Sequence, residues 1–451
     1  MKVAIVGTGY VGLTTGICLS FIGHEVTCLD TDERKIAHLR SGQSPFYEPH
    51  LAEMLAAADV RFTTSYADAI PQAEVVFIAV GTPSRADGKP NLDYLSSAAR
   101  QLGENLGDAF TVIVNKSTVP IGSGNWVDSL VREAWEGKHG RRANGHFAVA
   151  SNPEFLREGS ALHDSLYPDR VVIGADSTQA LERLYTLYRP LLEQTFTSPS
   201  DLPRPERLGA VALISSDLAS AELIKYAANA FLALKVSFIN EVGALAERVG
   251  ADIKQVARGI GLDARIGPRF LQAGIGWGGS CFGKDTAALV STAEEYKLDM
   301  PIVRAARQVN SRQREVVVEK LQDALKILKG RSVGLLGLAF KPNTDDLRDA
   351  PALDIARRLM ERGARVRVHD PVALDVARTK EPDLAVAWCA TLEEVAEGVD
   401  ALVLVTEWPQ YLQIDWPGLA KRMRTPLVLD GRHFLDRAAL REAGFQYLSV
   451  G

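Results

Sequence analysis

KVAIVGTGYVG, residues Lys2–Gly12, joins a short apolar run to a G-x-G-x-x-G motif. The apolar run predicts a β-strand over Lys2–Val6, and a helical pattern follows over Val11–Ile22. In this context the first glycine allows a tight turn, the second lets the backbone approach a pyrophosphate, and the third lets the helix pack closely. The N–H groups at the start of the helix then face the phosphates. The sequence therefore predicts a dinucleotide site formed by Gly7, Gly9, Tyr10, Val11 and Gly12.

Asp30 follows the next predicted strand, Glu25–Leu29. A carboxylate at this position hydrogen-bonds the ribose hydroxyls of the adenosine and repels a 2′-phosphate. Asp30 therefore favours NAD over NADP as the cofactor. The alternative interpretation is a glycine-rich turn with a surface aspartate, which the ordered succession of strand, glycines, helix and acid disfavours.

Strand and helix patterns alternate along both ends of the chain. Further strands are predicted at Val75–Val80, Thr111–Lys116, Phe147–Ser151, Ser332–Leu338, Arg365–His369, Ala401–Thr406 and Leu427–Asp430, with a helix at Ala352–Glu361. The proline-containing stretch Leu191–Glu206 looks like a boundary, and a long helix is predicted from Ser216 to Val249. We expect an α/β protein with two Rossmann-like doubly wound domains joined by a long central helix. The expected domains are residues 1–205, 206–315 and 316–451.

Composition excludes several function classes. The 451 residues carry a net charge of −5, and no basic run indicates nucleic-acid binding. Cys18, Cys28, Cys281 and Cys389 form no CxxC pair, so neither a metal site nor a disulfide framework is indicated. No apolar run approaches a membrane span, and the N-terminus lacks the pattern of a signal peptide. A cytoplasmic protein is expected.

The stretch Gly276–Asp285, GWGGSCFGKD, carries the strongest chemical signal. Its glycines let backbone N–H groups approach a ligand. Lys284 is a cation close in sequence to Cys281, and a nearby cation favours the nucleophilic thiolate. A buried hydrophobic thiol is the alternative for any single cysteine, and it is the preferred interpretation for the other three.

Other polar residues stand where a ligand site is expected. Lys225 and Asn229 share one face of the long helix, where a solvent-directed lysine is the alternative. Glu154 and Glu158 in Asn152–Glu158, and Thr118 in Lys116–Pro120, follow strands at the sheet edge where α/β proteins bind ligands. A helix cap or a solvated acid is the commoner explanation for each of these alone, but their joint placement favours acid–base chemistry.

Nearly the whole chain resembles the UDP-glucose/GDP-mannose dehydrogenase family. The resemblance is carried by Gly7–Gly12, Pro45–Pro49, Ser117–Pro120, Asn152–Glu158, Tyr167–Arg170, Lys225 with Asn229, Gly276–Asp285, Phe340-Lys341 with Arg348, and Asp430–Arg432. It implies NAD-dependent oxidation of the 6-hydroxymethyl group of a nucleotide sugar to a carboxylate. Tyr167–Arg170 and Gly276–Cys281 are most similar to the branch that acts on UDP-glucose. The family fold implied is two Rossmann-like domains with a dimerisation helix, so a homodimer or higher homo-oligomer is expected.

The resemblance also implies residue roles. Cys281 captures the aldehyde, Lys225 and Asp285 hold water and the developing oxyanion, Asn229 positions the sugar, and Glu154 assists thioester hydrolysis, with Thr118 at the nicotinamide side. Cofactor contacts are implied for Asp30, Lys35, Thr82, Thr118, Glu158, Lys284 and Arg348. Substrate contacts are implied for Glu154, Phe155, Leu156, Arg157, Glu158, Lys225, Asn229, Arg265, Phe270, Leu271, Gln272, Ala273, Gly274, Gly278, Phe340, Lys341 and Arg432. Gly283 and Trp277 depart from common versions of the family, at positions that bear on loop rigidity and on the fit to the sugar.

A primary alcohol needs two hydride transfers to become an acid, so the expected reaction consumes two NAD⁺. The expected route passes through a thiohemiacetal and a thioester on the cysteine, and ends in hydrolysis. The open alternatives are another nucleotide sugar, such as GDP-mannose or a UDP-N-acetylhexosamine, a one-step β-hydroxyacid dehydrogenase, and a non-catalytic binding protein. The last two leave the set of Cys281, Lys225, Asn229 and Asp285 unexplained.

Overall fold

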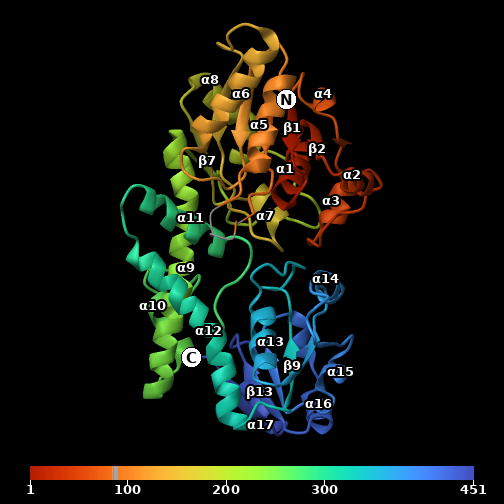
Figure 1. The fold of residues 1–451 in the computed structure, drawn as a ribbon, viewed down its shortest axis with the longest axis vertical. Coiled ribbons are helices and arrows are strands. Elements are labelled where there is room, and N and C mark those ends of the chain that lie inside the picture. The colour runs from red at the N-terminus through yellow and green to blue at the C-terminus, as the bar shows by residue number, and fades with distance from the viewer. Residues whose placement is uncertain (84, 86–89) are drawn as a thin grey trace. The chain divides into compact units, whose positions relative to one another are not determined.

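The structure is a computed structural model that describes every residue except 84 and 86–89. The chain forms two compact units, which Figure 1 shows with their elements labelled. The first unit contains Met1–Ala227 and Ala287–Thr292, and the second contains Ala228–Thr286 and Ala293–Gly451.

The first unit is built on an eight-stranded sheet with the order β3-β2-β1-β4-β5-β6-β7-β8. Its strands are β1 (Lys2–Val6), β2 (Glu25–Leu29), β3 (Val60–Thr63), β4 (Val75–Ile78), β5 (Thr111–Asn115), β6 (Phe147–Ser151), β7 (Arg170–Ala175) and β8 (Ala212–Ser216). All neighbouring strands are parallel except β6 and β7. The chain reverses its winding direction between β1 and β4, and ligands of doubly wound sheets bind at such a switch point.

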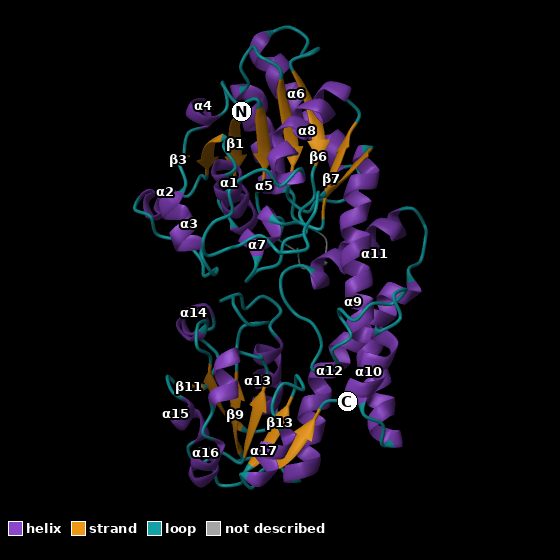
Figure 2. Ribbon diagram, turned by 180° about the vertical axis from the view of Figure 1, so that it is seen from behind, coloured by secondary structure: helices purple, strands orange, loops and turns teal. Residues whose placement is uncertain are grey.

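Helices cover both faces of this sheet (Figure 2). They are α1 (Tyr10–Phe21), α2 (Glu33–Arg40), α3 (Leu51–Ala57), α4 (Tyr66–Ala69), α5 (Asp93–Asn105), α6 (Ser123–His139), α7 (Ala161–Leu166) and α8 (Thr178–Leu192). Alternate residues of β1 enter different apolar clusters, because successive strand side chains point to opposite faces. Val3 and Ile5 pack with α1, α3 and α8, whereas Ala4 and Val6 pack with α5 and α6. Burial on both faces explains the continuous apolar strand sequences.

The second unit contains a six-stranded parallel sheet with the order β11-β10-β9-β12-β13-β14. Its strands are β9 (Ser332–Leu336), β10 (Arg365–His369), β11 (Ala387–Trp388), β12 (Ala401–Leu404), β13 (Leu427–Asp430) and β14 (Gln446–Ser449). Its helices are α10 (Ile253–Gly261), α12 (Pro301–Leu325), α13 (Pro351–Glu361), α14 (Leu374–Lys380), α15 (Leu392–Ala396), α16 (Trp416–Arg422) and α17 (Arg437–Glu442), with a 3₁₀ turn, η1, at Pro409–Gln413. The strand order repeats that of the first six strands of the other sheet.

Two helices contain residues of both units. The long helix α9 (Leu218–Val249) begins in the first unit and ends in the second, and the helix α11 (Phe282–Glu295) belongs to the second unit except for its middle, Ala287–Thr292. The predicted α/β class, with two doubly wound sheets and a long central helix, is confirmed.

The strands β3, β7, β8, β11 and β14 were not predicted. β8 lies C-terminal to the predicted boundary at residue 205 and pairs with β7 in the first sheet. The predicted start of the long helix, Ser216, is the last residue of β8, and the helix begins at Leu218. β8 is short and mostly exposed, so its sequence lacks the apolar run that marks a buried strand.

Candidate functional site

The glycine loop between β1 and α1 leaves room for an anion. Gly7 has φ +100°, and a Cβ there would lie 2.6 Å from the carbonyl oxygen of Ala79, while a Cβ on Gly12 would lie 1.9 Å from that of Gly7. Gly9 is the helix N-cap, and a Cβ there would have no atom within 4 Å. No side chain caps this helix end. The first-turn N–H groups thus border open space, which fits the pyrophosphate of a dinucleotide.

Asp30 lies directly after β2, beside this loop. Its Oδ2 accepts hydrogen bonds from the Thr8 N–H at 2.9 Å and from Lys35 Nζ at 2.9 Å, and its Oδ1 accepts from the Asp32 N–H at 3.1 Å. Burial alone raises the pKa of Asp30, but these hydrogen bonds outweigh it and lower the pKa below its usual value. The carboxylate is therefore charged and held in place at the position where a ribose acceptor is expected.

Tyr10 makes a contact that the sequence did not predict. Its hydroxyl donates to Glu48, and the two oxygens of Glu48 accept the N–H groups of Gly159 at 2.6 Å and Ala161 at 2.7 Å. Burial, followed by the charge of Glu48, raises the pKa of Tyr10 far above its usual range. Glu48 therefore links the start of α1 to the turn before α7 through hydrogen bonds. This turn directly follows the predicted site residue Glu158.

A buried ion pair follows the end of β6. Lys225 Nζ donates to Glu154 Oε1 at 2.8 Å, with side chains only 4% and 6% exposed, and Glu154 Oε2 accepts the Leu156 N–H at 2.9 Å. The Phe155 ring lies 3.7 Å under the guanidinium of Arg170 and 5.5 Å from Lys225 Nζ. Lys225 is thus directed into the protein and not toward solvent.

A second lysine lies close to this pair. Lys116 Nζ donates to Asn152 Oδ1 at 2.8 Å, and the Tyr188 hydroxyl donates to the same oxygen at 2.5 Å. Burial lowers the pKa of Lys116 to about 8; the charge of Glu154 opposes this shift and that of Lys225 adds to it. The region therefore holds two lysines around one carboxylate. No site role was predicted for Lys116, although it is the first residue of the Lys116–Pro120 motif.

Thr118 and the loop to α6 are fixed by two contacts. Thr82 Oγ1 donates to the carbonyl oxygen of Thr118 at 3.0 Å. Glu222 on α9, which is buried, accepts the N–H groups of Gly122 at 2.6 Å and Gly124 at 2.9 Å. Burial raises the pKa of Glu222 to about 7, although the two N–H groups act to lower it. Glu222 was also missed, and its only sequence signal is an acid on the apolar side of a helix.

In the second unit, Cys281 is the N-cap of α11 at the end of the glycine-rich loop. Its thiol is partly exposed, and Ser280 Oγ lies 3.5 Å from its Sγ. The other three cysteines are buried. A helix N-terminus favours a thiolate, so Cys281 has the location expected of a nucleophile. No disulfide forms in the part of the chain that the structure describes.

Asp285 and Asn229 meet in the same unit. Asn229 Nδ2 donates to Asp285 Oδ2 at 2.6 Å, both residues are buried, and Lys284 Nζ lies 3.8 Å from Asp285 Oδ1. The Asp285 N–H donates to the carbonyl oxygen of Cys281, so this carboxylate lies one turn along α11 from the thiol.

The predicted sugar-binding residues of this unit are held in different ways. The side chains of Leu271 and Ala273 are buried in the apolar cluster beside α9 and α10. A ligand could therefore contact these two residues only through their backbone. Arg432 Nη1 donates to the carbonyl oxygen of Gly276 at 2.9 Å. Arg265 is 89% exposed and pairs with Asp263, which leaves it outside this group.

The loop after β9 carries further predicted residues. Lys341 Nζ lies 5.3 Å from the centre of the Phe340 ring, and Arg348 pairs with Asp346. Within the second unit, the Gly279 N–H donates to the carbonyl oxygen of Arg348 at 3.0 Å, which joins this loop to the cysteine loop. Lys284 and Arg348, both predicted to contact the cofactor, belong to this unit.

The second sheet repeats the fold of the first without its dinucleotide chemistry. Asp370 follows β10 as Asp30 follows β2, but it is buried, and its Oδ2 accepts the N–H groups of Leu338 at 2.7 Å and Ala339 at 3.0 Å and the indole N–H of Trp408 at 3.1 Å. Its Oδ1 accepts two further backbone N–H groups. Asp370 therefore fixes the loop after β9 and has no accessible oxygen for a ribose.

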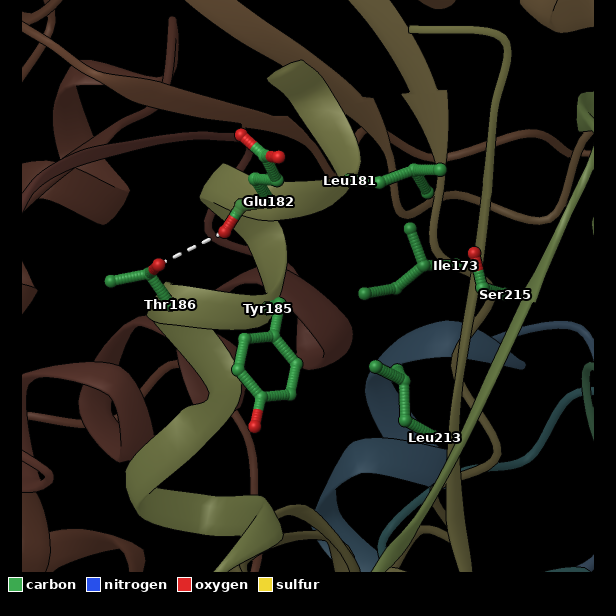
Figure 3. Close-up of a pocket in the computed structure, with 7 residues that line it drawn as sticks. All are labelled: Ile173, Leu181, Glu182, Tyr185, Thr186, Leu213 and Ser215. Atoms are coloured by element: carbon green, nitrogen blue, oxygen red, sulfur yellow. Dashed lines mark hydrogen bonds between the residues drawn. The ribbon is translucent and has the colours of Figure 1, made fainter. Parts of the chain in front are cut away.

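The first unit also has a groove of about 400 Å³, whose lining residues are drawn in Figure 3. It is lined by Ile173, Leu181, Glu182, Tyr185, Thr186, Leu213 and Ser215, none of which belongs to the predicted site. Among the described residues, no cluster of His, Cys, Asp and Glu has the arrangement of a metal site. None of the described helices has the length and apolarity to cross a membrane.

Comparison with known proteins places this site in a family. Residues 1–192 match the NAD binding domain of the UDP-glucose/GDP-mannose dehydrogenase family, residues 219–312 its central domain, and residues 334–437 its UDP binding domain. The chain belongs to this family. It is an NAD-dependent oxidoreductase, and the glycine loop with Asp30 lies in the family's NAD binding domain.

Several members of the family are similar over nearly their full length. The UDP-glucose 6-dehydrogenase of Pseudomonas aeruginosa is 45% identical, with 100% of this chain and 97% of that protein covered. The structure of a UDP-glucose dehydrogenase from the archaeon Pyrobaculum islandicum superposes with a TM-score of 0.88 at 39% identity, covering 99% of this chain and 97% of that one. A UDP-D-ManNAc dehydrogenase structure from Pyrococcus horikoshii has a TM-score of 0.82 at 27% identity, covering 100% and 99%.

Proposed function

We propose that this chain oxidises UDP-glucose to UDP-glucuronate, consumes two NAD⁺ per product, and uses Cys281 as a covalent nucleophile. The observation that carries the proposal is the partly exposed thiol at the N-terminus of α11, followed one turn later by the buried Asp285. The greater similarity to UDP-glucose dehydrogenases than to the UDP-D-ManNAc enzyme supports the choice of sugar.

The first oxidation removes a hydride from the 6-hydroxymethyl carbon and a proton from its hydroxyl group, and the proton passes to solvent water. Bound NAD⁺ supplies the hydride acceptor for both oxidations. The ammonium of Lys225 stabilises the negative charge that develops on the sugar oxygen, and the hydrogen bond to Glu154 holds that ammonium in place. Asn229, fixed by Asp285, orients the sugar. The product of this step is an aldehyde.

The second oxidation uses the cysteine. The Cys281 thiolate adds to the aldehyde carbon, and the oxygen takes up a proton to give a thiohemiacetal. Loss of that proton and of a hydride leaves a thioester. Water then adds to the thioester carbon and the thiolate leaves, which releases the carboxylate. Glu154 assists this hydrolysis as a base, and Lys225 and Asp285 hold the water and the oxyanion.

The remaining residues bind and orient. We assign Asp30 to the adenosine ribose, the glycine loop to the pyrophosphate, and Lys35, Thr82, Thr118, Glu158, Lys284 and Arg348 to further cofactor contacts. The segments 154–158 and 270–274, together with Gly278, Phe340, Lys341 and Arg432, are assigned to the nucleotide sugar. Arg265 is also assigned to it, although its exposure and its ion pair with Asp263 require movement on binding.

We further propose a cytoplasmic homodimer or higher homo-oligomer that serves polysaccharide biosynthesis, with domains at 1–205, 206–315 and 316–451. The exposed aromatic and aliphatic side chains of Phe231, Phe238 and Leu245 support the oligomer, because they recur every seven residues along α9. The absence of a disulfide among the described cysteines is compatible with a reducing compartment.

The test is a substrate panel. The pure protein is incubated with NAD⁺ and, in turn, UDP-glucose, GDP-mannose and UDP-N-acetylglucosamine, while NADH formation is followed. We expect the highest kcat/KM for UDP-glucose and two NADH for each UDP-glucuronate. A higher kcat/KM for GDP-mannose would refute the assignment of the sugar, and one NADH per product would refute the four-electron reaction.

A further inference from the structure

The loop that leads to Cys281 is held by side-chain amides through its backbone. The side chain of Asn310 on α12 hydrogen-bonds both backbone polar groups of Trp277. Its Oδ1 accepts the Trp277 N–H at 2.7 Å, and its Nδ2 donates to the Trp277 carbonyl oxygen at 2.9 Å. Asn240 Oδ1 accepts the Gly274 N–H at 2.8 Å, and Gln313 Nε2 donates to the Gly274 carbonyl oxygen at 3.1 Å. Asn310 thus pairs with Trp277 as a neighbouring strand would.

Three residues on one face of α12 hydrogen-bond this loop or its neighbour. Asn310, Gln313 and Arg314 are spaced i, i+3 and i+4, so they lie on the same side of the helix. Arg314 donates to the Asp349 carboxylate at 2.7 Å and to the Trp277 carbonyl oxygen at 3.4 Å. The two amides are buried, and burying polar groups is costly unless each finds a partner. The facing loop is buried as well, so an apolar face would leave the backbone N–H and C=O groups of Trp277 and Gly274 without these partners.

The loop has little freedom against this face. Gly276 has φ +85°, and a Cβ there would lie 2.3 Å from Asn310 Oδ1. On the opposite side, a Cβ on Gly278 would lie 2.3 Å from the Asp349 carbonyl oxygen, and one on Gly279 would lie 2.6 Å from the Phe340 ring. The backbone therefore fits between α12 and the loop after β9 only because side chains are absent. Two residues after Gly279 the chain reaches Cys281.

We propose that Asn310 is a positioning residue for the Cys281 thiol, supported by Gln313 and Arg314. The polar face of α12 sets the backbone of residues 274–279, and that backbone places Sγ at the N-terminus of α11. The proposal rests on the proposed function only in that Cys281 is the nucleophile. A purely structural role for Asn310 predicts lower stability without any change in the thiol of the folded protein.

The test separates these roles. Asn310→Asp keeps the acceptor, removes the donor and brings a carboxylate against the Trp277 carbonyl oxygen, and Asn310→Leu removes both bonds. We expect kcat with UDP-glucose to fall ~10- to 100-fold, as small misplacements of reacting groups do, with an unchanged KM for NAD⁺. The alkylation rate of Cys281 by iodoacetamide, followed by peptide mass spectrometry in the folded protein, should change severalfold. The buried Cys18, Cys28 and Cys389 serve as internal references.

Ser311→Asp is the matched control, because Ser311 is exposed on the same turn of α12 and should leave both readouts unchanged. Wild-type alkylation in folded Asn310→Asp and Asn310→Leu would overturn the proposal, whatever happens to kcat. If Asn310→Leu does not fold, Gln313→Met replaces it, since that variant keeps the length of the side chain and loses only the bond to Gly274. The alkylation measurement needs no turnover, so it remains decisive even if UDP-glucose proves not to be the substrate.

Discussion

Lys225 on α9 and Glu154 after β6 form an ion pair of 2.8 Å that is almost fully enclosed. The second carboxylate oxygen of Glu154 accepts the Leu156 N–H, so the acid is fixed by the turn as well as by the lysine. The proposed charge stabiliser and the proposed hydrolytic base thus depend on each other for their position. Either side chain left alone would be a buried group without its main counter-charge.

Breaking this pair is expected to cost stability as well as activity. Glu154→Ala should lower the free energy of unfolding by about 3–5 kcal/mol, the range for an ion left buried without its partner. Urea unfolding followed by circular dichroism measures it. Glu133→Ala is the control, because Glu133 pairs with Arg100 at the surface and should cost less than about 1 kcal/mol. Equal losses in the two variants would show that the Lys225–Glu154 pair is solvated in solution.

Cofactor preference should depend on Asp30. The wild type is expected to prefer NAD⁺, because the charged carboxylate repels a 2′-phosphate. Asp30→Ala removes that charge and releases Lys35, which is bonded to Asp30 and lies where it can attract the phosphate. The ratio of kcat/KM for NAD⁺ to that for NADP⁺ should therefore fall. An unchanged ratio in Asp30→Ala would mean that Asp30 does not bind the ribose.

Glu222 should make stability depend on pH. Its pKa is raised from 4.5 to about 7 in the folded chain, chiefly by burial. Between these values the unfolded chain has lost the proton and the folded chain still holds it, so stability falls as pH rises and levels off above about 7. At about 1.4 kcal/mol per pH unit, the total loss is about 3 kcal/mol. Glu222→Gln cannot ionise and should lack this contribution.

The measurement compares the free energy of unfolding at pH 5 and pH 8. The wild type should lose more stability over this interval than Glu222→Gln does. Glu133→Gln, at an exposed position, should keep the wild-type difference between the two pH values. Identical pH profiles for wild type and Glu222→Gln would show that Glu222 is ionised in the folded chain at pH 5.

Local patterns predicted most strands of the two sheets, but not β3, β7, β8, β11 or β14. β1, β2 and β6 have the predicted bounds, because each is an apolar run buried on both faces and ended by a turn. β8 escaped prediction because an exposed edge strand such as Ala212–Ser216 carries no such run. The turn between β1 and α1 could also be predicted from local sequence, because it needs a glycine with positive φ and Gly7 supplies one.

Partners that are distant in sequence could not be predicted. Asn229 and Asp285 were each singled out, but their 2.6 Å contact joins residues on two helices that are 56 positions apart in the sequence. Glu48 and Lys116 bond to backbone N–H groups or amides elsewhere in the chain, which leave no pattern around the acid or the lysine itself. Glu222 on α9 does leave a trace, as an acid on the apolar side of a helix. The i, i+3, i+4 face of α12 leaves a similar one, since Asn310 and Gln313 stand where an apolar residue is expected.

The last prediction concerns the order of the two oxidations. If the Cys281 thiolate traps the aldehyde, Cys281→Ala should still bind NAD⁺ and UDP-glucose, because the thiol is partly exposed and the loop is held by other side chains. Steady-state formation of UDP-glucuronate should fall by several orders of magnitude, as is common when a nucleophile is removed. In Cys281→Ser the poorer nucleophile and the slower hydrolysis of an ester should let a covalent sugar adduct accumulate, visible by intact-protein mass spectrometry. The double variant Cys18→Ala/Cys389→Ala, which removes two of the buried thiols, is the control and should keep the two-NADH stoichiometry. If Cys281→Ala forms the acid at near wild-type rates, the aldehyde is oxidised as its hydrate and the covalent route is wrong.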